Sequence, residues 1–424
     1  MSGRKRPTTG PGDGALGSAR DGALGGARDG VLDRALDGAA GGTRTDAGTG
    51  RREGQGIIGV TDANGTTPPK PGDGRARGID FGRRILLVRP ARWLSLRLGL
   101  RTTVVCGLLT LAALAAAVLG LSTGEFTVPP GEVIAVLTGQ GTGPARLVVF
   151  EWRLPRALLA LFIGAALGLS GAIFQSLTRN PLGSPDVIGF STGAYTGVLA
   201  TMVLVGRGYY ETAGGALVGG LITAIVVYAL AYRRGVQGFR LIIVGIAISA
   251  VLASVNQWFI IKVNLQTAVA AALWGQGSLN DLGWDQVPPV TVAVALLCVP
   301  LLALGPRLPL LEMGDDAAAA LGVRVERTRQ VYLVVGVALV GVATAAAGPI
   351  SFVALAAPQL AQRLTRTAGT TLTASALMGA LLLAASDWVA RWAFAPNELP
   401  VGVVTVSLGG AYFAWLLFRQ ARRE

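Results

Sequence analysis

The sequence predicts an all-α polytopic membrane protein with about ten transmembrane helices. Hydrophobic residues make up 51% of the 424 residues and charged residues only 14%, and the mean hydropathy is +0.54. This composition is typical of a membrane protein and not of a soluble domain. The chain also contains repeated apolar runs of roughly 20 residues, and at about 1.5 Å per residue each run is long enough to cross a ~30 Å hydrocarbon core.

Residues 1–80 differ from the rest of the chain. They are rich in Gly, Ala, Asp, Arg and Thr, and an imperfect eight-residue unit recurs as DGALGSAR, DGALGGAR and DGVLDRAL. Because the segment has no large apolar cluster, burial cannot offset the entropy lost on ordering it. We therefore expect a disordered cytoplasmic tail, and the missing apolar region near the start argues against a secretory signal.

Residues 81–101 form a basic segment directly before the first apolar run. They include six arginines and no acidic residue: Arg83, Arg84, Arg89, Arg92, Arg97 and Arg101. Basic residues beside a transmembrane segment favour the cytoplasmic side. Trp93 and the leucines after it suggest an amphipathic lead-in at the membrane interface, although a plain anchor is an equal interpretation.

Residues 102–419 contain the predicted membrane domain. The apolar runs are 103–121, 157–177, 187–206, 213–232, 239–261, 286–305, 331–348, a broken run at 349–364, 372–392 and 401–418. Ten crossings from a cytoplasmic start return the basic residues 420–424 to the cytoplasm, and the same count places the arginines after runs four, six and eight inside. The eighth run contains Pro349, Pro358, Gln359 and Gln362, and such a broken helix requires burial among others or beside a water-filled path.

The stretch 153–194 carries the most informative motifs. It contains R-x-P-R before a Gly- and Ala-rich helix, then S-G-x-x-x-Q, N-P-L and I-G-x-S-x-G-A. Further motifs are G-P-I-S-F-V-A-L-A-A-P-Q from Gly348, G-A-L-L-L-A-A-S-D-W-V-A-R from Gly379 and E-L-P-V-G-V-V-T from Glu398. The motif positions are Gln175, Asn180, Pro181, Leu182, Pro185, Gly189, Gly348, Pro349, Pro358, Gln359, Asp387, Glu398 and Pro400.

In their order and spacing, these motifs resemble the FecCD-type permease family of ABC importers for iron-siderophores, haem and cobalamin. The resemblance covers about Arg97 to Arg419. Three places depart from the family pattern: Asp315 replaces a usual Glu and keeps its charge, Gln359 replaces a common His, and Gly409 to Phe413 lacks a usual proline. Glutamine keeps a hydrogen-bonding side chain but loses the ionisable ring.

The resemblance implies a type II ABC importer permease with no cofactor and no catalytic residue of its own. Its expected partners are cytoplasmic ATPase subunits, an extracytoplasmic substrate-binding protein and a second permease subunit, identical or paralogous. The dimer would form the translocation path in the plasma membrane. The expected cargo is a ferric siderophore, and haem and cobalamin stay open as alternatives.

Three arginines lie on the outer side by this count, against the charge bias. Arg153 and Arg156 precede the second run, and Arg391 lies near the end of the ninth. They can snorkel or pair with acidic neighbours such as Glu151 or Asp387, which lies one turn before Arg391. By resemblance, arginines at these positions engage glutamates of the binding protein, so we expect a docking role.

The cytoplasmic loop 305–329 is too long for a simple turn. Its Ala-rich centre favours helix, and acidic residues suit a helix start. We therefore expect one or two short surface helices. By resemblance, M-G-D-x-x-A-x-x-L-G places coupling helices against the ATPase subunit, at Gly314, Asp315, Ala318, Leu321 and Gly322.

Composition also excludes several function classes. The chain has no histidine, which excludes a His-ligated metal and a catalytic His, and Cys106 and Cys298 give no disulfide framework. Its lysines, Lys5, Lys70 and Lys262, lie in no phosphate-binding loop, so ATP hydrolysis would need another polypeptide. The positive charge is explained by loop arginines at the bilayer, not by nucleic acid. An ion-gradient-driven secondary transporter is the alternative, and the scarcity of intramembrane carboxylates argues against it.

Overall fold

A computed structural model describes residues 85–91, 94–124, 126–141, 143–232, 238–393 and 398–422. The chain divides into two units, Met1–Gly78 and Ile79–Glu424. All described residues belong to the second unit. The predicted disordered tail, residues 1–80, therefore lies outside the described residues, and so do residues 423–424 of the basic C-terminus.

Each of the ten predicted apolar runs coincides with a helix. They are α1 Leu100–Ser122, α4 Leu154–Thr178, α5 Phe190–Leu204, α6 Tyr209–Ala231, α7 Gly238–Lys262, α9 Val287–Leu304, α12 Val325–Ala347, α13 Val353–Thr365, α14 Leu372–Trp392 and α15 Val401–Ala421. Seven described helical segments are long and apolar enough to cross a membrane. The predicted all-α membrane fold is confirmed, and the broken eighth run forms only the 13-residue α13, with Pro358 inside it.

Shorter elements connect these helices. Between α1 and α4 lie α2 Pro130–Leu137, α3 Pro144–Arg146 and the π-helix η1 Leu147–Arg153; η2 Pro185–Ile188 precedes α5, and α8 Leu265–Trp274 follows α7. The loop 305–329 contains η3 Gly305–Arg307, α10 Leu308–Glu312 and α11 Asp315–Ala320. The predicted short helices of this loop are therefore present.

The basic segment before α1 forms a small antiparallel hairpin of β1 Ile85–Ala91 and β2 Leu94–Gly99. Its register pairs Ile85 with Gly99, and the pairing is irregular between Val88 and Ala91. Pro90 lies in that irregular stretch, where a residue without an N–H is tolerated in a strand. The sequence analysis expected an amphipathic lead-in or an anchor and did not predict this hairpin.

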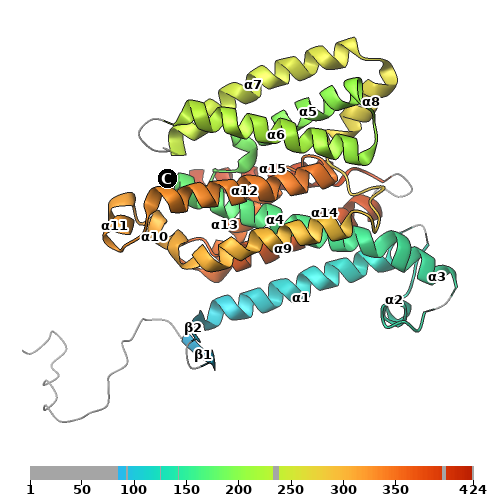
Figure 1. Ribbon diagram of the computed structural model, residues 1–424. Coiled ribbons are helices and arrows are strands. Elements are labelled where there is room, and N and C mark those ends of the chain that lie inside the picture. Colours follow the sequence, from blue (N-terminus) through green and yellow to red (C-terminus); the bar gives the residue numbers. More distant parts are fainter. Residues whose placement is uncertain are drawn as a thin grey trace, which may run out of the picture. The chain divides into compact units, whose positions relative to one another are not determined.

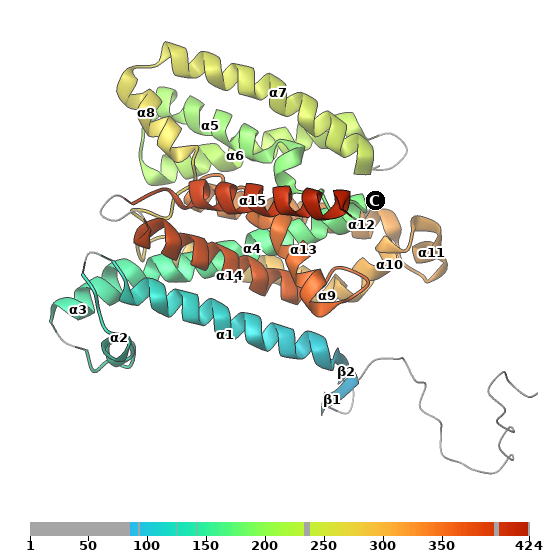
Figure 2. The ribbon, with the colours of Figure 1, turned by 180° about the vertical axis from the view of Figure 1, so that it is seen from behind.

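Helix α4 lies in the middle of the membrane unit, against α9, α12, α13 and α14 (Figures 1 and 2). Small residues set how closely these helices approach. A Cβ atom on Gly168 would lie 2.2 Å from the Ser375 carbonyl of α14, and one on Gly171 would lie 1.7 Å from the Ala354 carbonyl of α13. Backbone contact of this kind provides the packing between helices where lipid removes the hydrophobic driving force.

A second group consists of α5, α6, α7 and α8, which lie together above α12 in Figure 1. Helices α5 and α6 pack through Gly193 and Gly197 on one side and Gly215 and Gly219 on the other. The Phe190 ring, at the start of α5, contacts both groups because it lies against Gly220 of α6 and Gly341 of α12.

The packing of α4 predicts opposite outcomes for two glycine-to-alanine substitutions. Gly171→Ala places a methyl group against the α13 backbone, so we expect a loss of about 1–3 kcal/mol or more in stability. In Gly107→Ala, on the exposed part of α1, the added methyl meets nothing within 4 Å, and stability should rise by up to about 1 kcal/mol. Thermal unfolding of the detergent-purified variants measures both, and equal melting temperatures would contradict the close approach.

Candidate functional site

An unusual helical segment precedes the N-terminal end of α4. The π-helix η1 runs directly into α4, and the N–H of Leu154 donates to the carbonyl of Val149, five residues earlier. Pro155 has no N–H to offer the carbonyl four residues before it, which disfavours ordinary α-helical bonding here. Arg153 at the end of η1 and Arg156 in the first turn of α4 reach toward the ends of α1 and α14.

Arg156 is held by two carboxylates from the C-terminal part of the chain. Its Nε donates to Asp387 Oδ1 at 2.9 Å, and its second terminal nitrogen lies 2.9 Å from the same oxygen. The remaining nitrogen donates to Glu398 Oε2 at 2.9 Å. Because Arg156 is only 8% exposed and Asp387 only 2%, this ion pair is buried.

Arg391 shares the carboxylate of Asp387. Its NH2 lies 3.0 Å from Asp387 Oδ2, one helical turn away, which is one of the pairings that the sequence analysis left open. Its NH1 donates to the carbonyl of Gly120 at 3.0 Å, at the end of α1. Asp387 therefore joins α4 to α14, and Arg391 joins α14 to α1.

Arg153 also binds the end of α1. Its guanidinium donates to the carbonyl oxygens of Leu121 at 2.8 Å and Phe126 at 2.7 Å. These carbonyls lie at and beyond the last turn of α1, where no helical N–H can reach them. Arg153 thus completes the C-terminal end of that helix and fixes the loop that follows.

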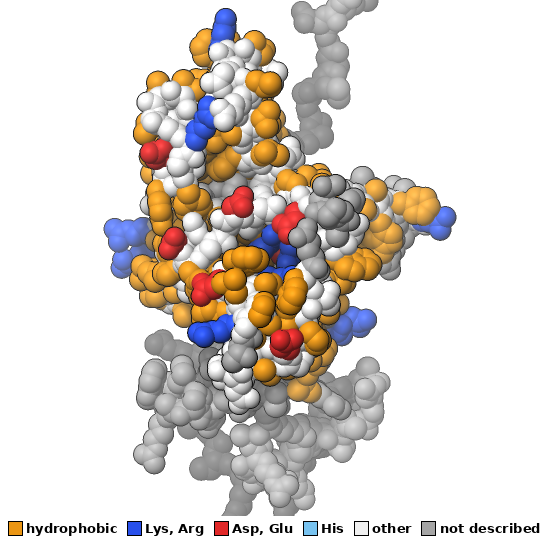
Figure 3. Space-filling view, turned by 90° about the vertical axis from the view of Figure 1, so that its right-hand side faces the viewer, with side chains coloured by type: hydrophobic (Ala, Val, Ile, Leu, Met, Phe, Trp, Pro, Cys, Tyr) orange, Lys and Arg blue, Asp and Glu red, His pale blue; other side chains and the backbone are white. Residues whose placement is uncertain are grey.

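We call Arg153, Arg156, Arg391, Asp387 and Glu398 the arginine cluster. Three guanidinium groups and two carboxylates leave the cluster with one excess positive charge. Figure 3 looks onto this end of the helices, and basic side chains lie in a recess near its middle, beside acidic ones. The buried Arg156 and Arg391 are engaged within the chain, so Arg153 is the more accessible of the three, and the docking role stays a prediction.

At the opposite end, the loop 305–329 presents two glycines that need their conformational freedom. Gly314, directly before α11, has φ +122, and Gly322, after it, has φ +82. An L-residue is strained at such angles. Leu321 between them is 59% exposed, so this part of the predicted coupling surface is accessible.

Ala318 departs from that expectation. Its side chain is fully buried and packs into the main apolar core together with Leu308 and Leu311. It faces inward because α11 is a single short helix with one side against the membrane unit. Ala318 therefore fixes the orientation of α11 and offers no surface to a partner in this conformation.

Asp315 attaches α11 to the rest of the chain. Its Oδ1 lies 2.5 Å from the Arg179 guanidinium at the end of α4 and 2.7 Å from that of Arg329 in α12. Burial by itself would raise the pKa of Asp315, but hydrogen bonds and charge from Arg329 and Arg179 outweigh burial, so the pKa lies below its ordinary value of 3.8.

Glu312 makes a second attachment. Its Oε1 accepts a hydrogen bond of 2.5 Å from the Ser176 hydroxyl of α4 and one of 3.3 Å from the Thr370 N–H before α14. We call the contacts of Glu312 and Asp315 the loop anchor. Sequence reasoning missed Glu312, Arg179 and Arg329, although opposite charges on neighbouring loops of the same predicted side were an available signal.

The family motifs stabilise the turn after α4. Gln175 Nε2 donates to the carbonyl of Leu355 at 2.9 Å, and Gln359 Nε2 donates to that of Pro181 at 2.7 Å. Gln359 thus uses its side-chain amide as a hydrogen-bond donor to the turn after α4. Asn180 Oδ1 accepts from the Leu182 N–H at 2.9 Å and closes the turn.

The other motif residues shape the backbone at turns and at the ends of helices. Gly189 and Gly348 have φ of +84 and +73, Pro185 begins η2, and the Pro400 carbonyl accepts from Val403 N–H at 3.1 Å. Pro349 lies directly after Gly348, and its carbonyl lies against Gly277. Within the described ranges, no group of three or more Cys, Asp or Glu residues is placed to hold a metal ion.

Comparison with known proteins gives one family. The model of the FecCD transport family matches residues 110–419. The chain is 51% identical over 324 residues to the ferric enterobactin transport system permease protein FepG of Escherichia coli K12, covering 76% of this chain and 98% of FepG. It is 38% identical over 315 residues to the Fe(3+) dicitrate transport system permease protein FecD of the same organism, covering 73% and 97%.

A solved structure agrees with these relatives. A metal-chelate type ABC transporter in an inward-facing conformation superposes with a TM-score of 0.66 and 26% sequence identity. The match covers 75% of this chain and 99% of that one. The agreement extends to the arrangement of the helices, because it spans nearly the whole of the compared subunit.

The arginine cluster predicts unequal costs for removing its two carboxylates. Asp387→Asn leaves two buried guanidinium groups without their shared counter-ion, so we expect a loss of about 3–5 kcal/mol. Glu398→Gln removes one contact of a carboxylate that is 48% exposed, and about 1 kcal/mol or less should be lost. Thermal unfolding in detergent compares them, and equal losses would contradict the central position of Asp387.

The loop anchor predicts a pH dependence. Because the folded state lowers the pKa of Asp315, its stabilising contribution is complete well above pH 3.8 and is lost as the pH falls through the lower folded value. The half-exposed carboxylate should contribute less than ~1 kcal/mol. We expect Asp315→Asn to speed hydrogen exchange of α11 at neutral pH but not in strong acid, after correction for intrinsic rates.

The control for this measurement is Asp316→Asn. Asp316 is exposed and also lies in the first turn of α11, so both substitutions remove the same favourable charge from the helix N-terminus. Equal exchange in the two variants at neutral pH would mean that the pairing with Arg179 and Arg329 does not stabilise α11.

Proposed function

Because the chain belongs to the FecCD transport family and is the permease subunit of a siderophore ABC importer, we propose that it carries ferric enterobactin or a closely related ferric siderophore. The proposal rests on the 51% identity to FepG, which extends over 98% of that protein. FecD, whose name gives ferric dicitrate as its cargo, shares 38%. The greater similarity to the enterobactin permease favours a cargo of that kind over ferric dicitrate.

The motor of this importer is a separate ATPase subunit. The three lysines of this chain lie outside any phosphate-binding loop, so it cannot hold the nucleotide in the usual way. We place the ATPase against Gly314, Asp315, Leu321 and Gly322, with α11 as the coupling helix. The two glycines support this because they form an exposed loop that an added side chain would strain.

Movement of α11 would reach the centre of the permease through the loop anchor. Asp315 binds Arg179 at the end of α4, and Glu312 binds Ser176 in its last turn. Since α4 packs against α12, α13 and α14, a displacement of its end moves the middle of the helix bundle. ATP-driven closure of the motors would in this way open and close the path between two permease subunits, identical or paralogous.

The opposite end faces the binding protein. We place both termini in the cytoplasm, because the arginine-rich loops fall on that side when ten helices are counted. The arginine cluster then lies outside, and its excess positive charge suits an acidic patch on the two lobes of the binding protein. Arg153, half-buried at the surface of the cluster, is the first contact we propose.

One reconstitution tests the class of transporter and the cargo together. The chain, its candidate partner permease, ATPase and binding protein are assembled in nanodiscs, and ATP hydrolysis is measured with the binding protein empty or loaded. We expect ferric enterobactin to stimulate hydrolysis more than haem or cobalamin does. Stimulation by cobalamin or haem alone would contradict the proposed siderophore cargo. If the chain binds no ATPase, the alternative of an ion-gradient-driven secondary transporter would be favoured instead.

The docking role is tested by reversing one charge in the same assembly. Arg153→Glu should reduce the affinity for the binding protein by about tenfold or more, since like charges would then meet across the interface. Arg146→Glu, at an exposed position of α3 on the same helical segment, is the matched charge reversal. Surface plasmon resonance measures the affinity of both variants for the binding protein. Equal affinities would mean that Arg153 does not contact the binding protein.

A further inference from the structure

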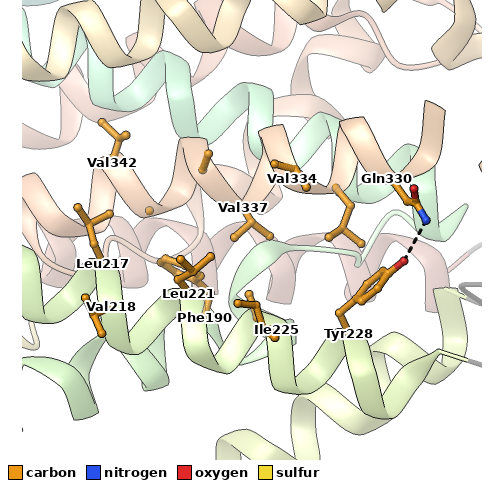
Figure 4. Close-up of a pocket in the computed structure, with 14 residues that line it drawn as sticks. Phe190, Leu217, Val218, Leu221, Ile225, Tyr228, Gln330, Val334, Val337 and Val342 are labelled. Atoms are coloured by element: carbon orange, nitrogen blue, oxygen red, sulfur yellow. Dashed lines mark hydrogen bonds between the residues drawn. The ribbon is translucent and has the colours of Figure 1, made fainter. Parts of the chain in front are cut away.

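A long apolar groove runs between α6 and α12 (Figure 4). One wall consists of Leu217, Leu221 and Ile225 from α6, and the other of Val334, Val337 and Val342 from α12. The groove has a volume of about 750 Å³, and Leu221, Ile225 and Val334 are 54%, 58% and 63% exposed. In a bilayer, these side chains face acyl chains and not water.

The floor of the groove is the Phe190 ring. It lies between two glycines, because a Cβ on Gly220 would come within 2.4 Å of the ring and one on Gly341 within 3.2 Å. The ring fills the space next to both helix backbones and holds α6 and α12 apart at this level. The hollow above it is therefore built into the packing.

The length of the groove matches one leaflet. From Gln330 to Val342 the α12 wall rises by twelve residue steps, or about 18 Å at the helical rise of about 1.5 Å. Half of a ~30 Å hydrocarbon core is ~15 Å. A single extended acyl chain therefore fits the groove along its length.

The groove ends in polar groups at the side of the coupling loop. Gln330 Nε2 lies 3.3 Å from the Tyr228 hydroxyl across the two walls, as Figure 4 shows. The Tyr228 ring lies 5.8 Å from that of Tyr232, which is 49% exposed. Tyrosines gather at this depth in membrane proteins, at the level of the lipid headgroups.

A second hollow, lined by three arginines, lies at the same end of α12 as Gln330, between α12 and the end of α9. It has a volume of about 370 Å³, and its lining contains Arg307, Arg324 and Arg327 but no acidic residue. Gly322 also lines it, so the hollow borders the proposed coupling surface. Arg327 precedes Gln330 by three residues, so the two share a face of α12. Within the described part of the chain, none of these arginines has an ion-pair partner, whereas nearby Glu326 lies 3.8 Å from Arg329.

We propose that the groove and the arginine hollow together bind one anionic phospholipid. An acyl chain lies between α6 and α12 over Phe190, the ester region meets Tyr228 and Gln330, and the phosphate lies among Arg324, Arg327 and Arg307. Basic pockets between transmembrane helices recognise anionic headgroups in this way. The inference requires only that the chain spans a membrane and does not depend on the siderophore.

A second copy of the chain fits this surface poorly. Two copies related by a twofold axis would meet through the same patch on each, so hollow would face hollow and leave the groove unfilled. The same contact would bring the unpaired arginines of both copies together, and like charges repel. A lipid meets neither obstacle, because its chain fills the groove and its phosphate neutralises the arginines.

Native mass spectrometry of the purified full chain tests the proposal. The protein is equilibrated with phosphatidylglycerol and phosphatidylcholine of identical acyl chains, in equal amounts. We expect one phosphatidylglycerol to be retained, with a preference that falls by about fivefold for each arginine removed in Arg324→Gln and Arg327→Gln. Arg422→Gln with Arg423→Gln removes the same charge at the end of the chain and should leave the preference unchanged.

Filling the groove tests the apolar part. Val334→Trp should displace the retained lipid, and Ile225→Trp does the same from the opposite wall if the first variant folds poorly. Val292→Trp, at a similarly exposed position of α9, is the matched control. Retention unaffected by both groove variants, or equal retention of the two lipids by the unmodified chain, would overturn the proposal.

Two further outcomes would contradict the lipid proposal by giving the groove or the arginines another partner. If Val334→Trp separates the permease subunits and leaves the lipid bound, the groove belongs to a subunit interface. If the double arginine variant keeps its lipid preference but loses the ATPase, the arginines bind the motor.

Discussion

The structure depends on the close approach of α4 to α13 and α14. Gly168 and Gly171 let the backbones meet at distances that no side chain would allow, so α4 is enclosed along most of its length. Lipid supplies no hydrophobic force to press helices together, and this contact must therefore come from van der Waals packing. A central helix held in this way is rigid, so a displacement of one end also moves the other end.

Both candidate sites lie at the ends of this helix. At its N-terminal end, Arg156 binds Asp387 of α14, and Arg153 binds carbonyls at and beyond the last turn of α1. At the other end, Ser176 and Arg179 bind the loop that carries α11. The geometry therefore connects the proposed docking surface to the proposed coupling surface through one continuous element.

The buried charges of the arginine cluster link α4 to α1 and α14, but they contribute little net stability. Burying Arg156 and Asp387 costs solvation, and only good geometry with further hydrogen bonds offsets that cost. The cluster has this geometry, but it also holds one positive charge more than it neutralises. Arg153 carries it nearest the surface, so a structural role and a docking role are compatible in the same group of residues.

The sequence by itself determined the class of the protein, the number of apolar helices and the family, because hydrophobic length and local motifs are properties of neighbouring residues. It also offered the pairing of Asp387 with Arg391, which lie one turn apart, as one possibility. The tertiary structure decided which distant groups meet: Arg156 with Glu398, Arg179 with Asp315, and Ala318 with the core instead of a partner. It also produced the hairpin before α1 and the groove over Phe190. These depend on how helices far apart in the chain pack against each other, which no local pattern contains.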